Sequence, residues 1–495
     1  MSDKSSPLSI VTNGAVLYFI GKVMSNGLAF SLQLLITRSL GAGSFGVFSY
    51  ARTILQIVNA FARLGVTESI MKFVPAFQHD GRTRGRYITL AFVTSIGGSV
   101  IASALLFYFA DIISVLTLDN SRLGDLLKIF SILLPLQVFT QATANTFRAF
   151  EMAREQVFIN DALVPILNVV SIGVAIILGS SIVGVAAAFS FAGLLAALIG
   201  LIILYNLIDI NLNLDLDKSE LYEYYNFSIP LTLTTAGALL YTQVDRLMIG
   251  YFLGDVEVGV YTIAIGLATT VGLALSGLNQ LFPPIASELH SQNNHTELRE
   301  LFQATTRWSL TICLLPALLL YIHRYEVLGL FGPEFQSGSL VLTLFILGQI
   351  TRSAVGPSGY MLMMTDHQYV VLFNRWLLGI SNVVANYVFI LKYGLSGAAI
   401  ASALTLALVN ILRLFELWFL EQHNPYTNRF IKPIFASLIV FAVVSIVHSN
   451  LLSTTLPNIF VIVFGCVSGL VVYSFCLYVF GIDEVDRQVY SELRG

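Results

Sequence analysis

Six cationic side chains fall inside apolar stretches that are long enough to cross a membrane. They are Lys22, Arg52, Arg63, Arg246, Arg352 and Arg375. A charge at the centre of a bilayer costs about 2.5–3.5 kcal/mol on insertion scales, so such a residue usually faces a cavity or a partner. Arginine stays charged when partly desolvated and binds phosphate through two parallel hydrogen bonds. The excess of cations therefore favours an anionic substrate, and Lys22 and Arg52 are the first candidates to bind it.

Two acidic side chains in the same kind of stretch, Asp161 and Asp245, are candidates for binding a coupling ion or a proton. Asp245 adjoins Arg246, and Asp161 lies near Asn160 and Pro165. A transporter that exports cations would need acids without neutralising partners. Neither residue is an obvious proton carrier by this criterion, and both stay candidates.

Neutral polar side chains extend these charged positions into stripes at helical spacing. The stripes combine Lys22, Asn26 and Gln33; Arg52, Gln56, Asn59 and Arg63; Gln137, Gln141 and Asn145; Thr235, Thr242 and Arg246; Gln349 and Arg352; and Arg375, Asn382 and Asn386. Two interpretations stay open for the amides. They can bind sugar hydroxyls, or they can form hydrogen bonds between packed helices, which contribute about 0.6 kcal/mol on average.

The elements that position these residues are about fourteen predicted membrane helices. Of the 495 residues, 56% are hydrophobic and only 11% are charged, and the mean hydropathy is +0.79. A spanning helix needs about 20 mostly apolar residues, whereas a barrel strand has about ten of alternating polarity. Helical segments are predicted over approximately 10–38, 44–66, 86–109, 124–148, 155–179, 182–206, 225–251, 257–281, 303–323, 338–363, 368–392, 396–420, 430–449 and 456–480. The predicted fold class is all-α.

A sequence pattern that occurs twice indicates that the chain is built from two related halves. Leu40-Gly41 to Ala51 matches Leu253-Gly254 to Ala264 at an offset of 213 positions, and Gly184 and Gly397 keep the same offset. Repeated halves are typical of transporters, which bind substrate where the halves meet. We predict a six-helix lobe over 1–207, a cytoplasmic linker over 208–224, a second six-helix lobe over 225–422, and two additional helices with a cytoplasmic tail over 423–495.

Charges in the loops predict the orientation of the chain. Lys and Arg are concentrated on the side that holds both ends of the chain, with Arg82, Arg84 and Arg86 as the densest cluster. The positive-inside rule then places both termini in the cytoplasm, in a multi-pass protein of the cell membrane. The cluster itself is best interpreted as a topology signal that contacts anionic headgroups.

Several functions are disfavoured by what the sequence lacks. The net charge of −3 gives no signature of nucleic-acid binding. No phosphate-binding loop of an ATPase occurs, and the cysteines and histidines show no metal-ligand spacing. We therefore expect neither cofactor nor metal, and no enzymatic activity.

Several motifs together resemble those of the polysaccharide flippases, in the multidrug/oligosaccharidyl-lipid/polysaccharide exporter superfamily. Thr37-Arg38-Ser39-Leu40-Gly41 followed by Phe45-Gly46-Val47-Phe48 is similar to the flippases' first signature. Leu64-Gly65 with Phe73-Val74-Pro75, and Asp245-Arg246-Leu247-Met248-Ile249-Gly250, resemble later landmarks. The resemblance covers nearly the whole chain, including the layout of twelve helices plus two.

The resemblance implies two six-helix lobes around a central cleft that opens alternately to each side. It also implies a substrate in which an oligosaccharide is linked to polyprenyl phosphate or diphosphate. We expect this substrate to contact Lys22, Asn26, Arg52, Gln56, Asn59, Arg246, Arg352 and Arg375. Membrane lipids, and glycan polymerases, ligases or glycosyltransferases, are the expected partners, and one chain suffices to form the site.

Two other functions stay open at this point. A proton- or sodium-coupled antiporter for drugs or other small molecules would belong to the same superfamily and would use Asp161 or Asp245. A membrane scaffold for glycan assembly would not transport, and its polar stripes would serve only to pack the helices.

Overall fold

Helices make up nearly all of the part described by the computed structural model, which comprises residues 7–208, 217–452 and 457–480. No strand occurs in these residues, so the predicted all-α class is confirmed. The chain divides into two compact units, Met1–Gly259 and Val260–Gly495, which are described separately below. Residues 1–6, 209–216 and 481–495, which include parts of the predicted linker and of the cytoplasmic tail, lie outside the described residues.

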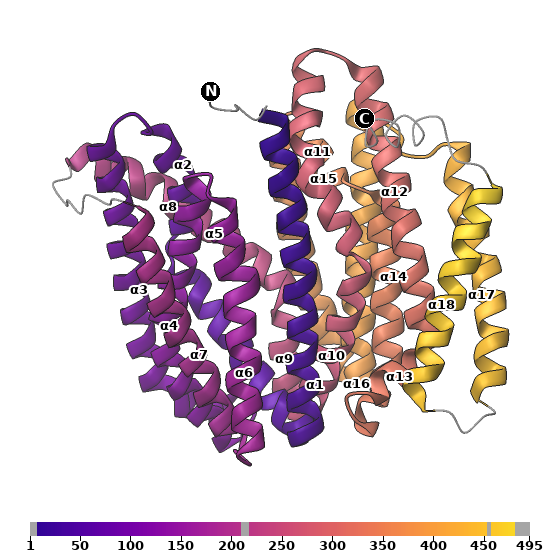
Figure 1. Cartoon of the computed structure of the whole chain (residues 1–495), viewed down its shortest axis with the longest axis horizontal. Coiled ribbons are helices and arrows are strands. Elements are labelled where there is room, and N and C mark those ends of the chain that lie inside the picture. Colours follow the sequence, from indigo (N-terminus) through magenta and orange to yellow (C-terminus); the bar gives the residue numbers. More distant parts are fainter. Residues whose placement is uncertain (1–6, 209–216, 453–456, 481–495) are drawn as a thin grey trace. The chain divides into compact units, whose positions relative to one another are not determined.

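The first unit contains the helices drawn in indigo to magenta in Figure 1. They are α1 (Pro7–Ala62), α2 (Val66–Ala76), α3 (Gly81–Leu116), α4 (Ser121–Ala149), α5 (Ala153–Val157), the π-helical turn η1 (Phe158–Leu163), α6 (Val164–Ile177), α7 (Ile182–Leu207), α8 (Lys218–Thr242), α9 (Val244–Phe252) and the start of α10 (Asp255–Val271). Helix α1 covers two predicted segments. They are separated at Gly41, where the backbone leaves the helical conformation with φ 76° and ψ 175°. Glycine adopts this positive φ without the steric cost that a side chain would add.

Aromatic packing joins the helices of the first unit at the end where α2, α3 and α8 begin. Phe73 on α2 stacks on Tyr87 of α3, with ring centroids 4.4 Å apart, and lies 6.0 Å from Tyr224 on α8. The Arg86 guanidinium lies 2.9 Å from the Glu220 carboxylate, whose other oxygen accepts a hydrogen bond from the backbone N–H of Asp217 and caps α8. Residues 218–224 of the predicted linker are therefore the first two turns of a helix that packs on α3.

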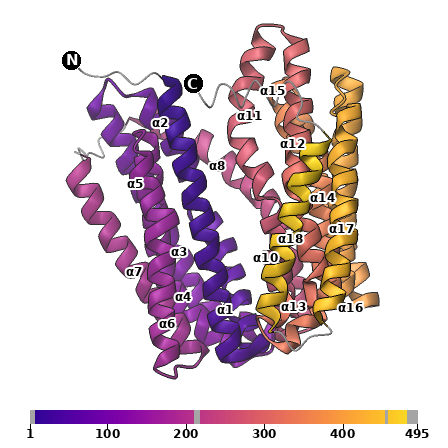
Figure 2. The same ribbon diagram turned by 45° about the vertical axis from the view of Figure 1, so that its right-hand side comes forward.

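The second unit continues with the helices drawn in pink to yellow. After α10 come α11 (Leu273–Ser291), α12 (His295–Ile322), α13 (Arg324–Gly329), the 3-10 turn η2 (Pro333–Gly338), α14 (Ser339–Val355), α15 (Ser358–Met364), α16 (Gln368–Glu421), η3 (Asn428–Phe430), α17 (Ile431–Leu452) and α18 (Asn458–Val479). Helix α16 also covers two predicted segments, with a break at Gly394, where φ is 57°. Helices α17 and α18 lie side by side and pack on α12 through Ile322, Val440 and Tyr473 (Figure 2).

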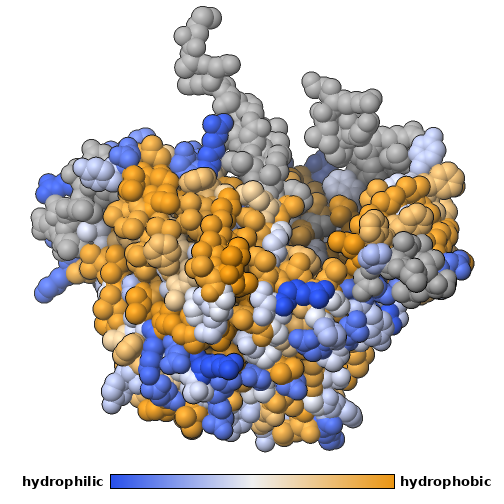
Figure 3. All heavy atoms as spheres, turned by 60° about the horizontal axis from the view of Figure 1, so that its bottom comes forward, coloured by the Kyte–Doolittle hydropathy of each residue, from blue (hydrophilic) through white to orange (hydrophobic). Residues whose placement is uncertain are grey.

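Nine helical stretches of the described residues are long and apolar enough to cross a membrane. One of them, Gln368–Glu421, contains two predicted segments, and α1 and α8 to α11 cover the four segments that remain. Large apolar side chains stay exposed on these helices, for example Ile101 on α3 and Phe475 on α18. Figure 3 shows such side chains as broad hydrophobic areas, which suit contact with lipid rather than with water. The chain is thus a multi-pass membrane protein.

The two copies of the repeated pattern meet at a pair of glycines, Gly46 on α1 and Gly259 on α10. A Cβ atom on Gly46 would collide with the backbone carbonyl of Asp255, and one on Gly259 would collide with the carbonyl of Ala42. Positions 42 and 255, like 46 and 259, are equivalent in the repeat. Each glycine therefore contacts the equivalent carbonyl of the other repeat copy, and only glycine allows the two backbones to come so close.

Candidate functional site

A cavity of about 670 Å³ lies within the first unit, between α1, α4, η1, α6, α7 and α8. Its lining is unusually polar for the interior of a membrane protein. The polar side chains around it are Lys22, Ser25, Arg52, Gln56, Asn59, Arg63, Thr67, Gln137, Thr140, Gln141, Asn145, Gln156, Asn160, Asp161, Asn168 and Thr235. Of the eight substrate-contacting residues predicted, the structure brings Lys22, Arg52, Gln56 and Asn59 together here.

Arg52 reaches the cavity from the part of α1 that follows the break at Gly41. Its guanidinium lies over the rings of Phe189 and Phe48, 5.3 Å and 5.9 Å from their centroids. No carboxylate among the described residues forms an ion pair with it, so its donors are available to a ligand. Stacking on an aromatic ring holds the flat guanidinium in place while its N–H groups stay free for an anion.

Lys22 lies on the first part of α1 and lines the same cavity. Its neighbour Gly21 is buried against Val157 and Asp161, and a Cβ there would come within 3.2 Å of the Asp161 Cβ. Lys22 and Asp161 are close enough to interact electrostatically. Asp161 is only 5% exposed, so this acid adds one buried negative charge to a cavity that holds three cations, Lys22, Arg52 and Arg63.

The π-helical turn η1 determines which side chains enter the cavity from the segment 153–177. A π turn places one extra residue in a helix, and such turns are frequent at functional sites. Here it presents Asn160 and Asp161 to the cavity, between Gln156 on α5 and Asn168 on α6. Gln156, Asn160 and Asn168 were not among the predicted site residues, although their spacing of four and eight positions is a helical stripe that the sequence already contains.

Amide groups on α1 and α4 form the cavity wall between the charged residues. The Asn59 side chain donates to Gln137 Oε1 over 3.3 Å, and the Asn145 side chain donates to Thr67 Oγ1 over 3.3 Å. The Asn59 Oδ1 and Gln141 Oε1 atoms are buried without a hydrogen-bond partner. Buried polar atoms are rarely left unpaired in native proteins, so these two oxygens indicate positions where water or ligand hydroxyls bind.

Other predicted residues of the first unit lie outside this lining. Asn26 is half-buried on α1, one turn after Lys22. Arg246 on α9 donates to Gln243 Oε1 over 2.6 Å, and it is close enough to Arg52 for the two cations to repel each other. Asp245 is 5% exposed, and its Oδ1 accepts a hydrogen bond from the backbone N–H of Arg246.

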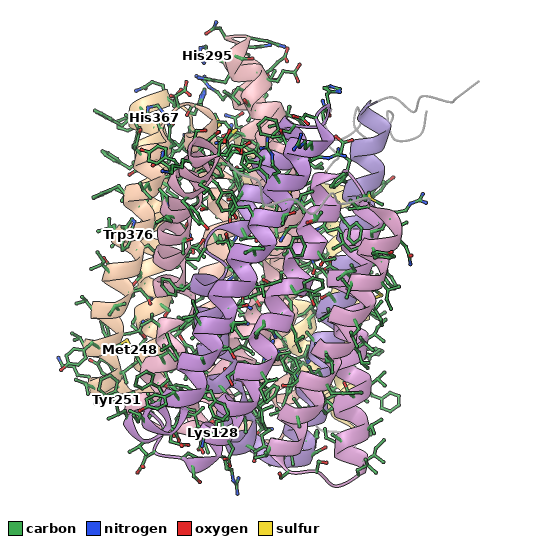
Figure 4. The ribbon with its side chains drawn as sticks, turned by 90° about the vertical axis from the view of Figure 1, so that its left-hand side faces the viewer. Lys128, Met248, Tyr251, His295, His367 and Trp376 are labelled. Carbon is green, nitrogen blue, oxygen red and sulfur yellow. The ribbon has the colours of Figure 1, made fainter. Side chains whose placement is uncertain are left out.

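Arg352 and Arg375 belong to a different cavity, which measures about 210 Å³ and lies within the second unit. Asn279, Asn410 and Arg413 line it with them. This cavity therefore contains three cationic side chains, as the first one does, and the bias towards cations seen in the sequence occurs in each unit separately. An apolar cavity of about 360 Å³ lies in the first unit, near the end that carries Lys128, and Met248 and Tyr251 line it (Figure 4).

Comparisons with known proteins identify the chain's relatives. Residues 35–337 match a family described as "Polysaccharide biosynthesis protein". The chain is 24% identical to the probable low-salt glycan biosynthesis flippase Agl15 of Haloferax volcanii, over 81% of this chain and 82% of that protein. It is 23% identical to the Lsg locus putative protein 1 of Haemophilus influenzae, over 68% of this chain and 80% of that protein.

Solved structures share the fold. The lipid II flippase MurJ, in an inward closed conformation, superposes with a TM-score of 0.76 over 94% of this chain and 98% of that one, at 14% sequence identity. An inward-facing multidrug resistance transporter of the MATE family superposes with a TM-score of 0.70 over 81% of this chain and 96% of that one, also at 14% identity. The chain thus shares its fold with these two transporters.

Proposed function

Because the chain belongs to the polysaccharide biosynthesis protein family, we propose that it is a membrane flippase for an oligosaccharide linked to polyprenyl phosphate or diphosphate. It moves this lipid from the cytoplasmic to the outer leaflet by alternating access, as one step in making a cell-surface polysaccharide or glycoprotein glycan. The observation that carries the proposal is the cavity of the first unit, where Arg52 and Lys22 stand among amides. The flippase names of MurJ and Agl15 support the same class of substrate.

The cavity provides the two kinds of contact that such a substrate needs. Arg52 and Lys22 bind the phosphate groups, because charge-assisted hydrogen bonds to phosphate are about twice as strong as neutral ones. The amides of Gln56, Asn59 and Gln137 bind sugar hydroxyls, each of which both donates and accepts. A site with a few charges and many amides suits a glycan, because binding then depends on many weak contacts that release easily on the other side.

The remaining predicted residues take part in the same transport cycle. Asn26 and Arg246 contact the substrate at the edge of the cavity, and Arg352 and Arg375 contact it in the second unit. The halves bounded by the linker 208–224 rock about the substrate, with both termini in the cytoplasm. A single chain does this, and glycosyltransferases, polymerases or ligases supply and consume the substrate.

A deletion strain tests the proposal through the position of the lipid-linked oligosaccharide. A glycan label that does not cross the membrane distinguishes the two leaflets. We expect the oligosaccharide to accumulate on the cytoplasmic face, and the wild-type gene but not Arg52→Gln to reverse this. Arg122→Gln is the matched control, because Arg122 is exposed and does not line the cavity. An unchanged distribution in the deletion strain, where no second flippase exists, would refute the proposal.

An antiporter coupled to protons or sodium is the second candidate function. The observation in its favour is Asp161, a buried acid in the cavity beside Lys22. An antiporter would export small molecules at a rate that depends on an ion gradient, and Asp161→Asn would abolish this dependence. Glycan transport that persists in Asp161→Asn without any drug efflux from the wild type would eliminate this candidate.

A further inference from the structure

Two histidines and one glutamate form a buried cluster in the second unit, away from both cavities described above. His323 follows the last residue of α12, Glu326 lies on α13, and His448 lies near the end of α17. His323 is 1% exposed and Glu326 is 8% exposed. One ligand atom from each of the three residues lies within 4.8 Å of the others. The cluster therefore joins three elements that are up to 125 residues apart in sequence.

Three buried polar atoms of the cluster have no hydrogen-bond partner. His448 Nε2 lies 3.1 Å from Glu326 Oε1, and the rings of His323 and His448 meet edge to face with centroids 4.7 Å apart. Both ring nitrogens of His323 and the Glu326 Oε2 atom are buried without a hydrogen-bond partner. Each unpaired buried polar group costs about 1–3 kcal/mol, so one ring nitrogen of His323 and the Glu326 Oε2 atom call for a common ligand. The second ring nitrogen of His323 points in another direction and does not bind that ligand.

No nearby cation takes that role in the described residues. The Arg324 guanidinium donates to the Tyr321 carbonyl over 2.8 Å and stacks on Tyr321 and Tyr325, 4.7 Å from each ring centroid. A histidine binds a metal through a ring nitrogen of its neutral form.

We propose that His323, Glu326 and His448 bind a divalent transition metal, with Zn²⁺ as the ion that fits their donor set best. Two imidazole nitrogens and one carboxylate oxygen, completed by a water molecule, are a common set of zinc ligands. The spacing of 3.1 Å between His448 Nε2 and Glu326 Oε1 is close to the edge of a zinc tetrahedron, about 3.3 Å for bonds of about 2.0 Å. Calcium and magnesium would instead require mostly oxygen ligands.

The metal ties α17, and with it the pair of C-terminal helices, to the end of α12. Helices α17 and α18 have no counterpart in the repeat, and an apolar contact through Ile322, Val440 and Tyr473 holds them to α12. Gly465 on α18 lies against the His323 ring, and a Cβ there would collide with Nε2. The absence of a side chain at position 465 thus leaves room for the ring, and α18 closes the cluster on that side.

The test measures Zn²⁺ binding by the full-length protein in detergent, purified without a polyhistidine tag, after a chelator has removed bound metal. We expect about one Zn²⁺ per chain, and at least a tenfold loss of affinity in His448→Gln and in Glu326→Gln. His367→Gln is the matched control, because His367 lies 3.3 Å from Glu421 but no second histidine of the described residues completes a cluster there. It lies at the end of the second unit that carries His295, the start of α12, far from His323 (Figure 4).

Two further measurements keep the test decisive if a ligand variant folds poorly. Gly465→Ala keeps all three ligands but displaces the His323 ring, so it should weaken Zn²⁺ binding, whereas Gly469→Ala, one turn further along α18, should not. Bound Co²⁺ should show visible absorption typical of low coordination number, and Zn²⁺ should remove it. Wild-type protein that retains no Zn²⁺, or retains as much as His448→Gln with equal affinity, would overturn the proposal. The cluster would then be a hydrogen-bonded one without metal.

Discussion

Replacing Arg52 separates the contribution of its charge from that of its shape. In the wild type the guanidinium is held over Phe189 and Phe48 and can give two parallel hydrogen bonds to a phosphate. Arg52→Lys keeps the positive charge but gives up the paired geometry, so it loses about one charge-assisted hydrogen bond. Arg52→Gln loses the charge and both of these bonds.

The magnitudes follow from the cost of each bond. One hydrogen bond to a charged group is worth about 1.5–3 kcal/mol, which corresponds to about a 10- to 150-fold change in affinity. We therefore expect Arg52→Lys to weaken binding by about that factor, and Arg52→Gln to weaken it by more than about 100-fold.

The assay is equilibrium binding of a short polyprenyl diphosphate to the purified protein in detergent, with the matching prenyl alcohol as the ligand that lacks phosphate. The alcohol should bind the wild type and both variants equally. Arg122→Gln, which alters an exposed arginine outside the cavity, should leave both affinities unchanged. Equal diphosphate affinity in the wild type and Arg52→Gln would refute the reasoning, because it would place the phosphate away from Arg52.

Three further predictions concern stability and pH. Gly259→Ala should lower the free energy of unfolding by about 1–3 kcal/mol, because its Cβ would collide with the Ala42 backbone. Thermal unfolding in detergent measures this change. The control is Gly173→Ala, because position 173 has open space around it. Glu220→Gln should lower the melting temperature and make Arg86→Gln less destabilising, because the two half-buried side chains form an ion pair; independent, additive effects would contradict this. Burial, aided by Arg299, His295 and His290, lowers the pKa of His423 to about 4, so the unfolded chain binds more protons between about pH 6.5 and pH 4. Stability should therefore fall as pH drops through that window, and His423→Gln should flatten the fall; an unchanged pH profile in that variant would show that His423 is not responsible.

The membrane helices and the repeat could be predicted from the sequence because each has a strong local signal. A run of 20 apolar residues has few structures available to it in lipid, and a charge within such a run stands out. The repeat keeps glycine at positions 41 and 254 because both adopt a positive φ, 76° and 128°, which glycine allows at little cost. The break in α16 at Gly394 lies three residues before the repeated Gly397, so the pattern alone did not locate it.

The composition of the site was harder to predict, because the sequence does not say which cavity a polar side chain faces. Arg352 and Arg375 have the same signature as Arg52, yet they line a cavity in the other unit. Gln156, Asn160 and Asn168 have a helical spacing that the sequence contains, but that spacing does not say that they face the same cavity as Arg52. The His323 cluster combines residues from three helices, and no spacing within the sequence indicates such a combination.

The glycine contact between Gly46 and Gly259 has a consequence for the origin of the chain. Each glycine receives the carbonyl of the residue four positions before the other, so the contact is related to itself by a two-fold rotation. A protein half as long, with one copy of the pattern, would form this contact between two identical subunits. Fusion of the two genes would then have released each copy to change separately. Positions 46 and 259 have kept glycine in both copies, whereas position 42 is alanine and its counterpart 255 is aspartate, whose carboxylate accepts a hydrogen bond from Asn120. The side chains at positions 42 and 255 have thus diverged, whereas glycine is kept at 46 and 259, where backbone touches backbone.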